Sequence, residues 1–258
     1  MIRKKTPEQV RSVIYGVHPV LETIRAGTRP VLEVYLARGP VIPQDLNAAL
    51  AETALSVNRV SAEQMRSLTG TLRHQGVAAR VGPYPYVDFE DMLEDLAHGT
   101  EPVVVLDEVQ DPANVGSILR SAECLGARGV ILTKDRAAPI SPLAEKASAG
   151  ASAHVPVARV VNLARTLGQL KEIGFWIYAA DSAGKDTCYS ADLSGKIALV
   201  LGSEGKGLRR LVRETCDLGV SIPMVGSIQS LNVAQAAAVL LAECLRRRTA
   251  VQPGTRQS

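Results

Sequence analysis

Aromatic side chains are scarce in this chain of 258 residues, where Phe, Tyr and Trp together make up only 3%. The core must therefore be built from Val, Leu, Ile and Ala, and hydrophobic residues of all kinds reach 46%. That share is typical of a folded globular protein. The scarcity of aromatic rings also argues against a stacking platform for single-stranded RNA.

Cysteine pairs with metal-binding or redox spacing are missing too. The four cysteines lie far apart in the sequence, at Cys124, Cys188, Cys216 and Cys244. This spacing excludes a C-x-x-C motif and does not suggest the disulfide framework of a small secreted protein. We therefore expect reduced thiols, no metal site and a cytoplasmic location.

Long apolar runs are absent as well. No run approaches the roughly 20 apolar residues needed to cross a bilayer, and none follows the basic residues 2–5 as in a signal peptide. The net charge of +3 is uneven, with +5 over residues 1–80, −6 over residues 81–101 and +4 over the remainder. Two basic blocks permit a polyanionic partner, although a solvated mixed surface gives similar numbers.

The first part of the chain reads as a small alternating α/β unit. Residues 12–81 contain expected strands at 31–37, 57–60 and 77–81, with helical patterns between them. Pro83 and Pro85 then interrupt regular structure, and an acidic stretch follows. We assign residues 12–81 to one domain and residues 82–99 to a linker.

The second part has a different pattern. Between residues 100 and 250, continuous apolar runs alternate with helical segments, at 103–106, 129–133, 175–180 and 197–201. Such runs are typical of strands buried on both faces. The alternation predicts a mostly parallel, doubly wound α/β sheet as a second domain.

A helix start with several polar groups follows the first of these runs. Asp111 is a good cap and Pro112 suits the first helical position. Asn114 lies in the first turn, and Arg120 follows six residues later. We expect Gly116 to leave room beneath Arg120 for the approach of a substrate backbone. A capped core helix with a surface arginine is an equally simple interpretation.

A glycine loop follows the run at 197–201. Its sequence is Gly202-Ser-Glu-Gly-Lys-Gly207, and three glycines in six residues indicate unusual backbone torsions or a close ligand. The spacing matches neither the dinucleotide fingerprint nor the phosphate loop of nucleotide-binding proteins. Glu204 is therefore either a functional carboxylate or a solvated residue in a tight turn.

A third segment runs from residue 221 to residue 234, through a Gly/Ser loop into the last helix. Ser230 and Asn232 are good helix-capping types, and both can also hold a ribose or a cofactor by hydrogen bonds. Their role in capping alone remains an alternative.

In this order the three segments closely resemble the signature motifs of the TrmH group of SPOUT RNA 2'-O-methyltransferases, and the resemblance covers residues 102–248. Residues 15–20 and 74–77 also resemble the L30e-like substrate-binding domain of the rRNA-modifying branch. The resemblance implies an N-terminal L30e-like α/β domain and a C-terminal SPOUT (α/β-knot) domain with a trefoil knot. It also implies a homodimer in which each active site includes residues of the partner subunit.

The resemblance implies a reaction and its residues. S-adenosyl-L-methionine would be the cofactor, and the substrate would be the ribose 2'-hydroxyl of a guanosine in 23S rRNA. By position in the motifs, the cofactor contacts would be Gly202, Ile222 and Leu231, with Leu201 and Met224 nearby. The reaction centre would be lined by Asn114, Arg120, Glu204, Ser230 and Asn232.

The family assigns the proton-accepting role to the arginine of the first motif, which is Arg120 here. A guanidinium stays protonated in proteins, so we expect Arg120 to act as a cation that holds the 3'-phosphate and stabilises the alkoxide. The proton would leave through another group or water. Arg209, Arg210 and Arg213 are further candidates for phosphate contact.

Other functions remain open at this point. The same chemistry could act on tRNA or another RNA. A non-catalytic RNA-binding protein is disfavoured because all five reaction-centre residues are present. A nucleotide-dependent oxidoreductase is disfavoured because the glycine fingerprint is missing.

Overall fold

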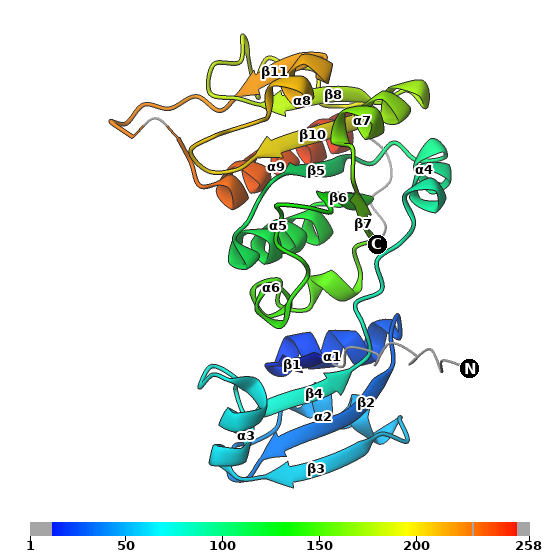
Figure 1. Ribbon diagram of the computed structural model, residues 1–258, viewed down its shortest axis with the longest axis vertical. Coiled ribbons are helices and arrows are strands. Elements are labelled where there is room, and N and C mark those ends of the chain that lie inside the picture. Colours follow the sequence, from blue (N-terminus) through cyan, green and yellow to red (C-terminus); the bar gives the residue numbers. More distant parts are fainter. Residues whose placement is uncertain (1–11, 229, 252–258) are drawn as a thin grey trace, which may run out of the picture. The chain divides into compact units, whose positions relative to one another are not determined.

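The computed structural model describes residues 12–228 and 230–251 (Figure 1). The chain divides into two compact units on either side of the Pro85–Tyr86 bond. Among the described residues, no helix has both the length and the apolar character needed to cross a membrane.

The first unit is a four-stranded sheet with helices on both faces. Its elements are β1 (Ser12–Tyr15), α1 (Val17–Ala26), β2 (Val31–Ala37), α2 (Gln44–Ala51), β3 (Ser56–Val60), α3 (Ala62–Thr69) and β4 (Val77–Val81). The strand order is β1-β4-β2-β3, with β2 and β3 parallel and the other pairs antiparallel. Because side chains alternate across a strand, Ile14 packs in the core below α1 and α2, and Tyr15 packs with Met65 of α3.

The strands expected at residues 31–37 and 77–81 are confirmed with the same bounds. Strand β1 is an addition to the strands that the sequence predicts. Gly16 follows this strand with a φ of 101°, and its N–H donates to the carbonyl of Val77 at 2.9 Å. The two segments that resemble the L30e-like domain, residues 15–20 and 74–77, therefore lie side by side at one end of the sheet.

The second unit is larger and alternates strands with helices. Its elements are α4 (Phe89–Ala97), β5 (Val103–Asp107), α5 (Pro112–Cys124), β6 (Gly129–Thr133), α6 (Pro142–Ala147), the short helix η1 (Ala151–Ala153), β7 (Val157–Val160), α7 (Leu163–Glu172), β8 (Trp176–Ala180), β9 (Asp186–Thr187), β10 (Ile197–Gly202), α8 (Arg210–Thr215), β11 (Leu218–Ser221) and α9 (Val233–Val251). The sheet order is β7-β6-β5-β10-β8-β11-β9, and all its neighbouring strands are parallel. The expected parallel, doubly wound α/β sheet is confirmed.

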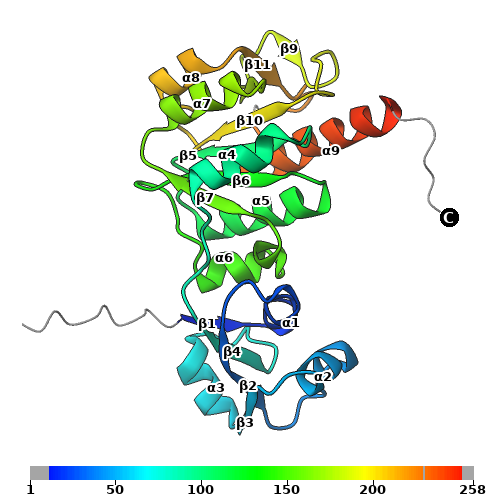
Figure 2. The same cartoon turned by 90° about the vertical axis from the view of Figure 1, so that its right-hand side faces the viewer.

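Helices cover both faces of this sheet (Figures 1 and 2). Helices α4, α7 and α8 pack on one face, where Leu96, Leu167 and Val212 share a core with Val103 and Val105 of β5. Helices α5 and α9 pack together on the other face. Because every residue of β5 is buried, its sequence shows no polar alternation, as expected for a strand covered on both sides.

Helix α4 lies inside residues 82–99, the segment assigned to a linker. Its residues Met92 and Leu96 are buried in the core of the second unit, and Asp88 caps it by accepting from the N–H of Glu90 at 2.9 Å. Acidic residues fill the solvent side of this helix and dominate the composition of the segment. Phe89 and Leu93 pack against the same core, so an apolar face anchors this helix to the second unit.

The order of strands reverses between β5 and β10. From β5 the chain continues to β6 and β7 on one side, and β10 lies on the other side with β8. Parallel sheets bind ligands at such a point, beyond the carboxyl ends of the strands. The first and second motifs leave the sheet here, after β5 and β10, and the third follows β11.

Candidate active site

The glycine loop after β10 folds back on itself. Ser203 and Gly207 pair as a bridge, with the Gly207 N–H donating to the Ser203 carbonyl at 2.9 Å. Gly205 and Gly207 have φ values of 81° and 64°, which side chains disfavour. A Cβ on Gly202 would lie 2.2 Å from the carbonyl carbon of Gly207. The glycines therefore allow the tight loop that presents Glu204.

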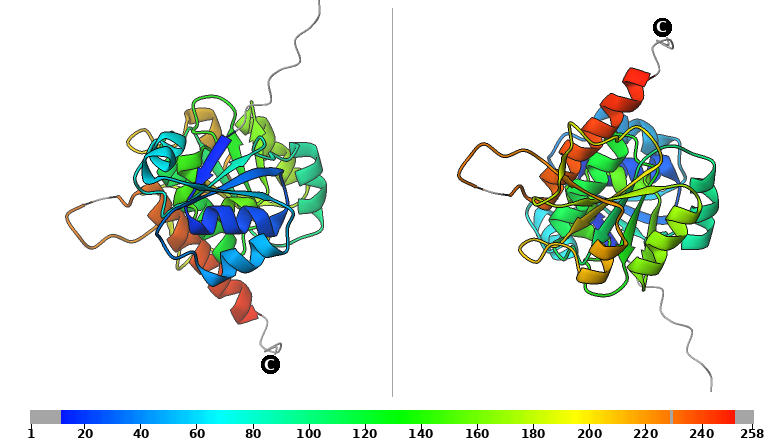
Figure 3. Two further views of the ribbon diagram at one scale, coloured as in Figure 1. Left: turned by 90° about the horizontal axis from the view of Figure 1, so that it is seen from below. Right: turned by 90° about the horizontal axis from the view of Figure 1, so that it is seen from above.

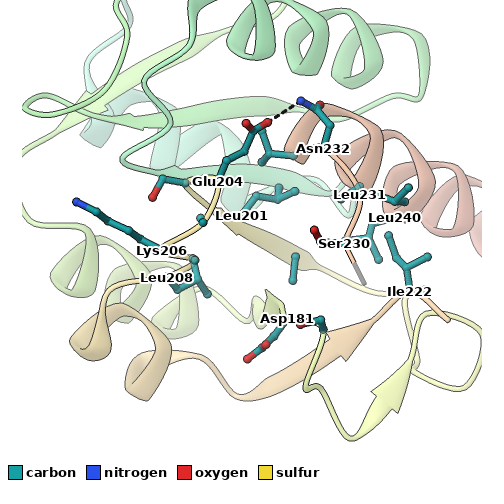
Figure 4. Close-up of a pocket in the computed structure, with 18 of the residues that line it drawn as sticks. Asp181, Leu201, Glu204, Lys206, Leu208, Ile222, Ser230, Leu231, Asn232 and Leu240 are labelled. Atoms are coloured by element: carbon teal, nitrogen blue, oxygen red, sulfur yellow. Dashed lines mark hydrogen bonds between the residues drawn. The ribbon is translucent and has the colours of Figure 1, made fainter. Parts of the chain in front are cut away.

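Three polar side chains, one from each motif, meet above this loop. Asn114 Nδ2 donates to Glu204 Oε1 at 2.9 Å, and Asn232 Nδ2 donates to the same oxygen at 2.6 Å. Asn232 Nδ2 is also 2.9 Å from Asn114 Oδ1. Figure 4 shows the contact between Glu204 and Asn232. Within the described part of the chain, Glu204 Oε2 has no hydrogen-bond partner, so one carboxylate oxygen is held and the other is open.

Two helix starts hold the asparagines in place. Asp111 caps α5 by accepting from the N–H of Ala113 at 2.9 Å, and Pro112 opens the helix, as the sequence predicts. Asn232 Oδ1 accepts from the N–H of Ala234 at 2.9 Å, near the start of α9. Asn232 therefore stabilises a helix start and binds Glu204 at the same time, while its contact with a ribose or a cofactor stays a prediction.

A pocket of about 640 Å³ lies beside this cluster. Leu201, Ile222 and Leu240 give it apolar walls, and Figure 4 shows Glu204 and Asp181 at different parts of its lining. Eight of the ten residues predicted for the site line it: Leu201, Gly202, Glu204, Ile222, Met224, Ser230, Leu231 and Asn232. Asn114 lines a smaller adjoining cavity.

Arg120 stands apart from the other predicted residues. It is exposed on α5 and lines neither cavity. Its guanidinium makes no hydrogen bond or ion pair with any residue that the structure describes. Six residues separate it from Asn114 along the helix, which turns the two side chains to different faces. One chain therefore assembles Asn114, Glu204, Ser230 and Asn232 without Arg120.

The expectation for Gly116 is wrong. A Cβ at this position would lie 2.2 Å from the carbonyl oxygen of Ala144 and 2.7 Å from the side chain of Ala147. Gly116 is buried where α5 crosses α6, so its missing side chain allows two helices to approach closely. It does not leave room for a substrate under Arg120.

The arginines after the glycine loop are engaged in ion pairs. Arg209 Nε lies 2.7 Å from Oδ1 of the fully buried Asp107, whose Oδ2 accepts from the Arg209 N–H at 2.9 Å. Arg213 pairs with Asp181 at 2.7 Å. These contacts fix the end of the glycine loop to the ends of β5 and β8. Asp107 and Asp181 are not among the residues singled out from the sequence; their one signal is an acidic residue directly after an apolar run.

Known proteins resemble both units. Residues 101–242 match the SpoU rRNA Methylase family, and residues 13–87 match the family described as RNA 2'-O ribose methyltransferase substrate binding. The 23S rRNA (guanosine-2'-O-)-methyltransferase RlmB of Xylella fastidiosa is 41% identical over 92% of this chain and 97% of its own length. An uncharacterised tRNA/rRNA methyltransferase of Mycobacterium avium is 41% identical over 95% of this chain and 80% of its own.

A solved structure gives the same result for the fold. The SpoU methyltransferase AviRb from Streptomyces viridochromogenes, in complex with the cofactor AdoMet, superposes with a TM-score of 0.78 at 26% identity, covering 93% of this chain and 91% of AviRb. The resemblance found in the three motifs is confirmed, and the chain belongs to the SpoU rRNA methylase family.

Proposed function

We propose that this protein transfers a methyl group from S-adenosyl-L-methionine to the ribose 2'-hydroxyl of a guanosine in 23S rRNA. The observation that carries the proposal is the Asn114–Glu204–Asn232 cluster at the edge of the 640 Å³ pocket. RlmB of Xylella fastidiosa, similar over nearly its whole length, is named for this reaction, and AviRb was solved with the same cofactor.

The pocket suits S-adenosylmethionine. Its volume falls within the range of about 300–1,000 Å³ typical of pockets for ligands of this size. Leu201, Ile222 and Leu240 offer apolar walls for an adenine ring, and Gly202 brings backbone close to the cavity. The carboxylate of Glu204 favours a positively charged sulfonium nearby. When bound, the cofactor supplies a methyl group that is electrophilic without a metal ion.

The chain's own residues must deal with the hydroxyl proton. A ribose hydroxyl is too weakly acidic to ionise at neutral pH, so a group that accepts its proton lowers the barrier. Glu204 is suited to this task, because two amides hold Oε1 while Oε2 is open. Asn114 and Asn232 orient the carboxylate, and Ser230 lines the same pocket as a further donor to the ribose or cofactor.

Lys206 is suited to the RNA backbone. It lies between Gly205 and Gly207 and lines both the cofactor pocket and the adjoining cavity. Its ammonium group forms no ion pair with another described residue. An unpaired cation at the mouth of the site favours a phosphate next to the target ribose.

The proposal includes a homodimer in which Arg120 serves the partner's site. Its exposure, and its absence from both cavities of its own chain, support this arrangement. Residues 223–228 project from the second unit (Figure 3) and carry the exposed apolar side chains Val225 and Ile228, which a second copy would cover. Arg120 would then hold the 3'-phosphate as a cation.

The remaining parts of the proposal concern organisation. Residues 12–81 would bind the rRNA, in line with the substrate-binding family that matches there, and residues 100–250 would form the catalytic domain with the trefoil knot of SPOUT proteins. A cytoplasmic location follows from an rRNA substrate. The tRNA/rRNA wording of the Mycobacterium avium relative keeps tRNA as the second candidate substrate.

The test is methyl transfer from labelled S-adenosylmethionine to separated rRNA and tRNA pools, followed by mapping of ribose methylation. We expect label at one guanosine 2'-oxygen of 23S rRNA and none with Arg120→Ala. Label in tRNA alone would overturn the substrate assignment. Cofactor binding without transfer to any RNA, including ribosomal precursor particles, would overturn the proposed reaction.

The origin of Arg120 can be tested by mixing inactive variants. A mixed dimer of Arg120→Ala and Glu204→Gln has one complete site if Arg120 acts across the interface, and none if it acts within its own chain. Equal mixing should restore about a quarter of the wild-type activity, since half of the dimers are mixed. No recovery in proven mixed dimers would contradict the shared site.

A further inference from the structure

A second cavity adjoins the reaction centre. Its volume is about 240 Å³, and it shares Ser203, Glu204, Lys206 and Val233 with the cofactor pocket. The rest of its lining comes from the end of β5 and the start of α5: Glu108, Val109, Gln110, Asp111 and Asn114. It is smaller than pockets that hold whole ligands, which begin near 300 Å³. It therefore suits one part of a ligand, such as a single nucleobase.

The polar lining selects against phosphate in the interior of this cavity. Glu108, Asp111 and Glu204 contribute carboxylates, and Lys206 contributes the one ammonium group in the lining. Carboxylates accept hydrogen bonds and cannot donate them when ionised. A base with adjacent N–H donors on its pairing edge fits such a lining. Guanine has this arrangement in its N1–H and 2-amino groups, whereas adenine has an acceptor at N1.

Glu108 is the carboxylate of this lining that neither caps a helix nor serves the proposed proton transfer. It follows β5 directly, in the left-handed region with a φ of 56°, a conformation that is disfavoured for residues other than glycine. Its side chain is only 14% exposed, and Oε1 lies 3.3 Å from Arg136 Nη1 and 3.5 Å from Arg209 Nε. Its Oε2 accepts no hydrogen bond from any described residue.

The surroundings of Glu108 hold this carboxylate in place. Arg209, which pairs with it, is itself fixed by two contacts of 2.7 and 2.9 Å to the buried Asp107. The Glu108 carboxylate is therefore held at Oε1, and its Oε2 is open. Non-glycine residues in disfavoured backbone regions cluster at functional sites, which agrees with a role in binding.

We propose that the 240 Å³ cavity receives the base of the target nucleotide and that Glu108 selects guanine by accepting hydrogen bonds from N1–H and the 2-amino group. This inference rests on the proposed function, since it names the nucleoside of the same reaction. The base would be turned out of its stack, as happens when enzymes act on single nucleotides in structured nucleic acids. Sequence-specific RNA recognition commonly reads such unstacked bases by their pairing edges.

The experiment compares rRNA fragments that carry guanosine, inosine or adenosine at the mapped target position. For the wild-type enzyme, loss of the 2-amino group in inosine should lower kcat/KM about tenfold, and adenosine should lower it by about a hundredfold or more. Glu108→Gln should lower kcat/KM for guanosine about 10- to 100-fold and reduce the guanosine-to-adenosine ratio by a similar factor. Its affinity for S-adenosylmethionine should stay at the wild-type value.

Glu123→Gln is the matched control. It makes the same chemical change at an exposed position of α5 that lines neither cavity, and it should keep the wild-type ratio. A Glu108→Gln enzyme that binds the cofactor normally and keeps the wild-type guanosine-to-adenosine ratio would overturn the inference. Inosine RNA methylated at the guanosine rate by the wild-type enzyme would also overturn it, without any variant that must fold. Failure of the proposed function is different: the wild-type enzyme would then methylate none of the RNAs.

Discussion

Substitution of Gly202 by alanine provides a direct test of the site geometry. The new Cβ would lie 2.2 Å from the Gly207 carbonyl carbon, 2.4 Å from its oxygen and 2.6 Å from the Leu208 nitrogen. Non-bonded carbon contacts are normally about 3.5–4.0 Å, so the loop must move by more than about 1 Å. These neighbours are backbone atoms, which cannot turn aside as a flexible side chain could.

Two measurements give the size of the effect. Overpacking costs about 1–3 kcal/mol, so the free energy of unfolding in urea should fall by that amount in Gly202→Ala. A displacement of about 1 Å at a reaction centre can lower the rate about a hundredfold, and we expect at least this loss in kcat/KM because Glu204 follows two residues later. Cofactor affinity should fall as well, since the same loop lines the pocket.

Two further alanine variants separate the causes. Gly195→Ala places its Cβ in open space in an exposed loop that lines neither cavity and should behave as the wild type. Gly116→Ala meets the Ala144 carbonyl oxygen at 2.2 Å, away from both cavities; it should lose stability with a smaller loss of cofactor affinity than Gly202→Ala. Wild-type activity and stability in Gly202→Ala would refute the reasoning.

Three other predictions follow from single contacts. Lys206→Gln should weaken RNA binding and reduce the salt dependence of the RNA affinity by about one phosphate contact. The control Lys185→Gln, at an exposed position, should change neither property. Binding titrations at several salt concentrations measure both. Lys196→Met should lower the free energy of unfolding by about 1–3 kcal/mol. The reason is that Lys196 Nζ donates to three carbonyls at the ends of α4 and α7, at 2.7, 3.2 and 3.4 Å. An unchanged midpoint of urea unfolding would contradict this prediction. Hydrogen bonds from Arg246 and Arg247 lower the pKa of Glu243 from 4.5 to about 2, so the stability that this pair provides is present above pH 4.5 and is lost as the pH falls toward 2. The full difference in the pKa of Glu243 corresponds to about 3 kcal/mol, and the exposure of Arg246 reduces this contribution to about 1 kcal/mol. Between pH 7 and pH 3, the free energy of unfolding in urea should therefore fall less in Glu243→Gln than in the wild type.

Local patterns in the sequence were sufficient where the deciding interactions are local. The run at residues 103–106 predicts β5 because a strand buried on both faces needs apolar residues throughout. Asp111 and Pro112 predict the start of α5, since a cap and its helix are neighbours in the chain. The Gly/Ser loop and Asn232 predict the approach to α9 for the same reason.

Contacts between residues far apart in the sequence could not be predicted from such local patterns. Asp107 is buried because it binds Arg209, which lies 102 residues further along the chain. The sequence predicts that Gly116 leaves room for a substrate, whereas the close carbonyl of Ala144 shows that another helix packs against it. Helix α4 was not predicted, because acidic residues dominate the composition of its segment although Met92 is buried.

The candidate site also has a part that the sequence predicts and a part that it does not. The motifs identified the residues that the structure brings together, because each motif ends a strand of one sheet. The spacing of Asn114 and Arg120 places them on different faces of α5, but the sequence does not tell which of the two faces turns toward the cavities.

The double contact of Asn232 limits which residues could replace it. Its Oδ1 accepts at the start of α9, and its Nδ2 donates to Glu204. Aspartate would keep the acceptor but place a second negative charge against the carboxylate, and serine is too short to reach both partners. Glutamine has the right groups, but its longer side chain is poorly suited to the helix start. Among the twenty amino acids, a short side-chain amide alone meets both demands, so this position should tolerate no substitution in an enzyme that keeps this geometry.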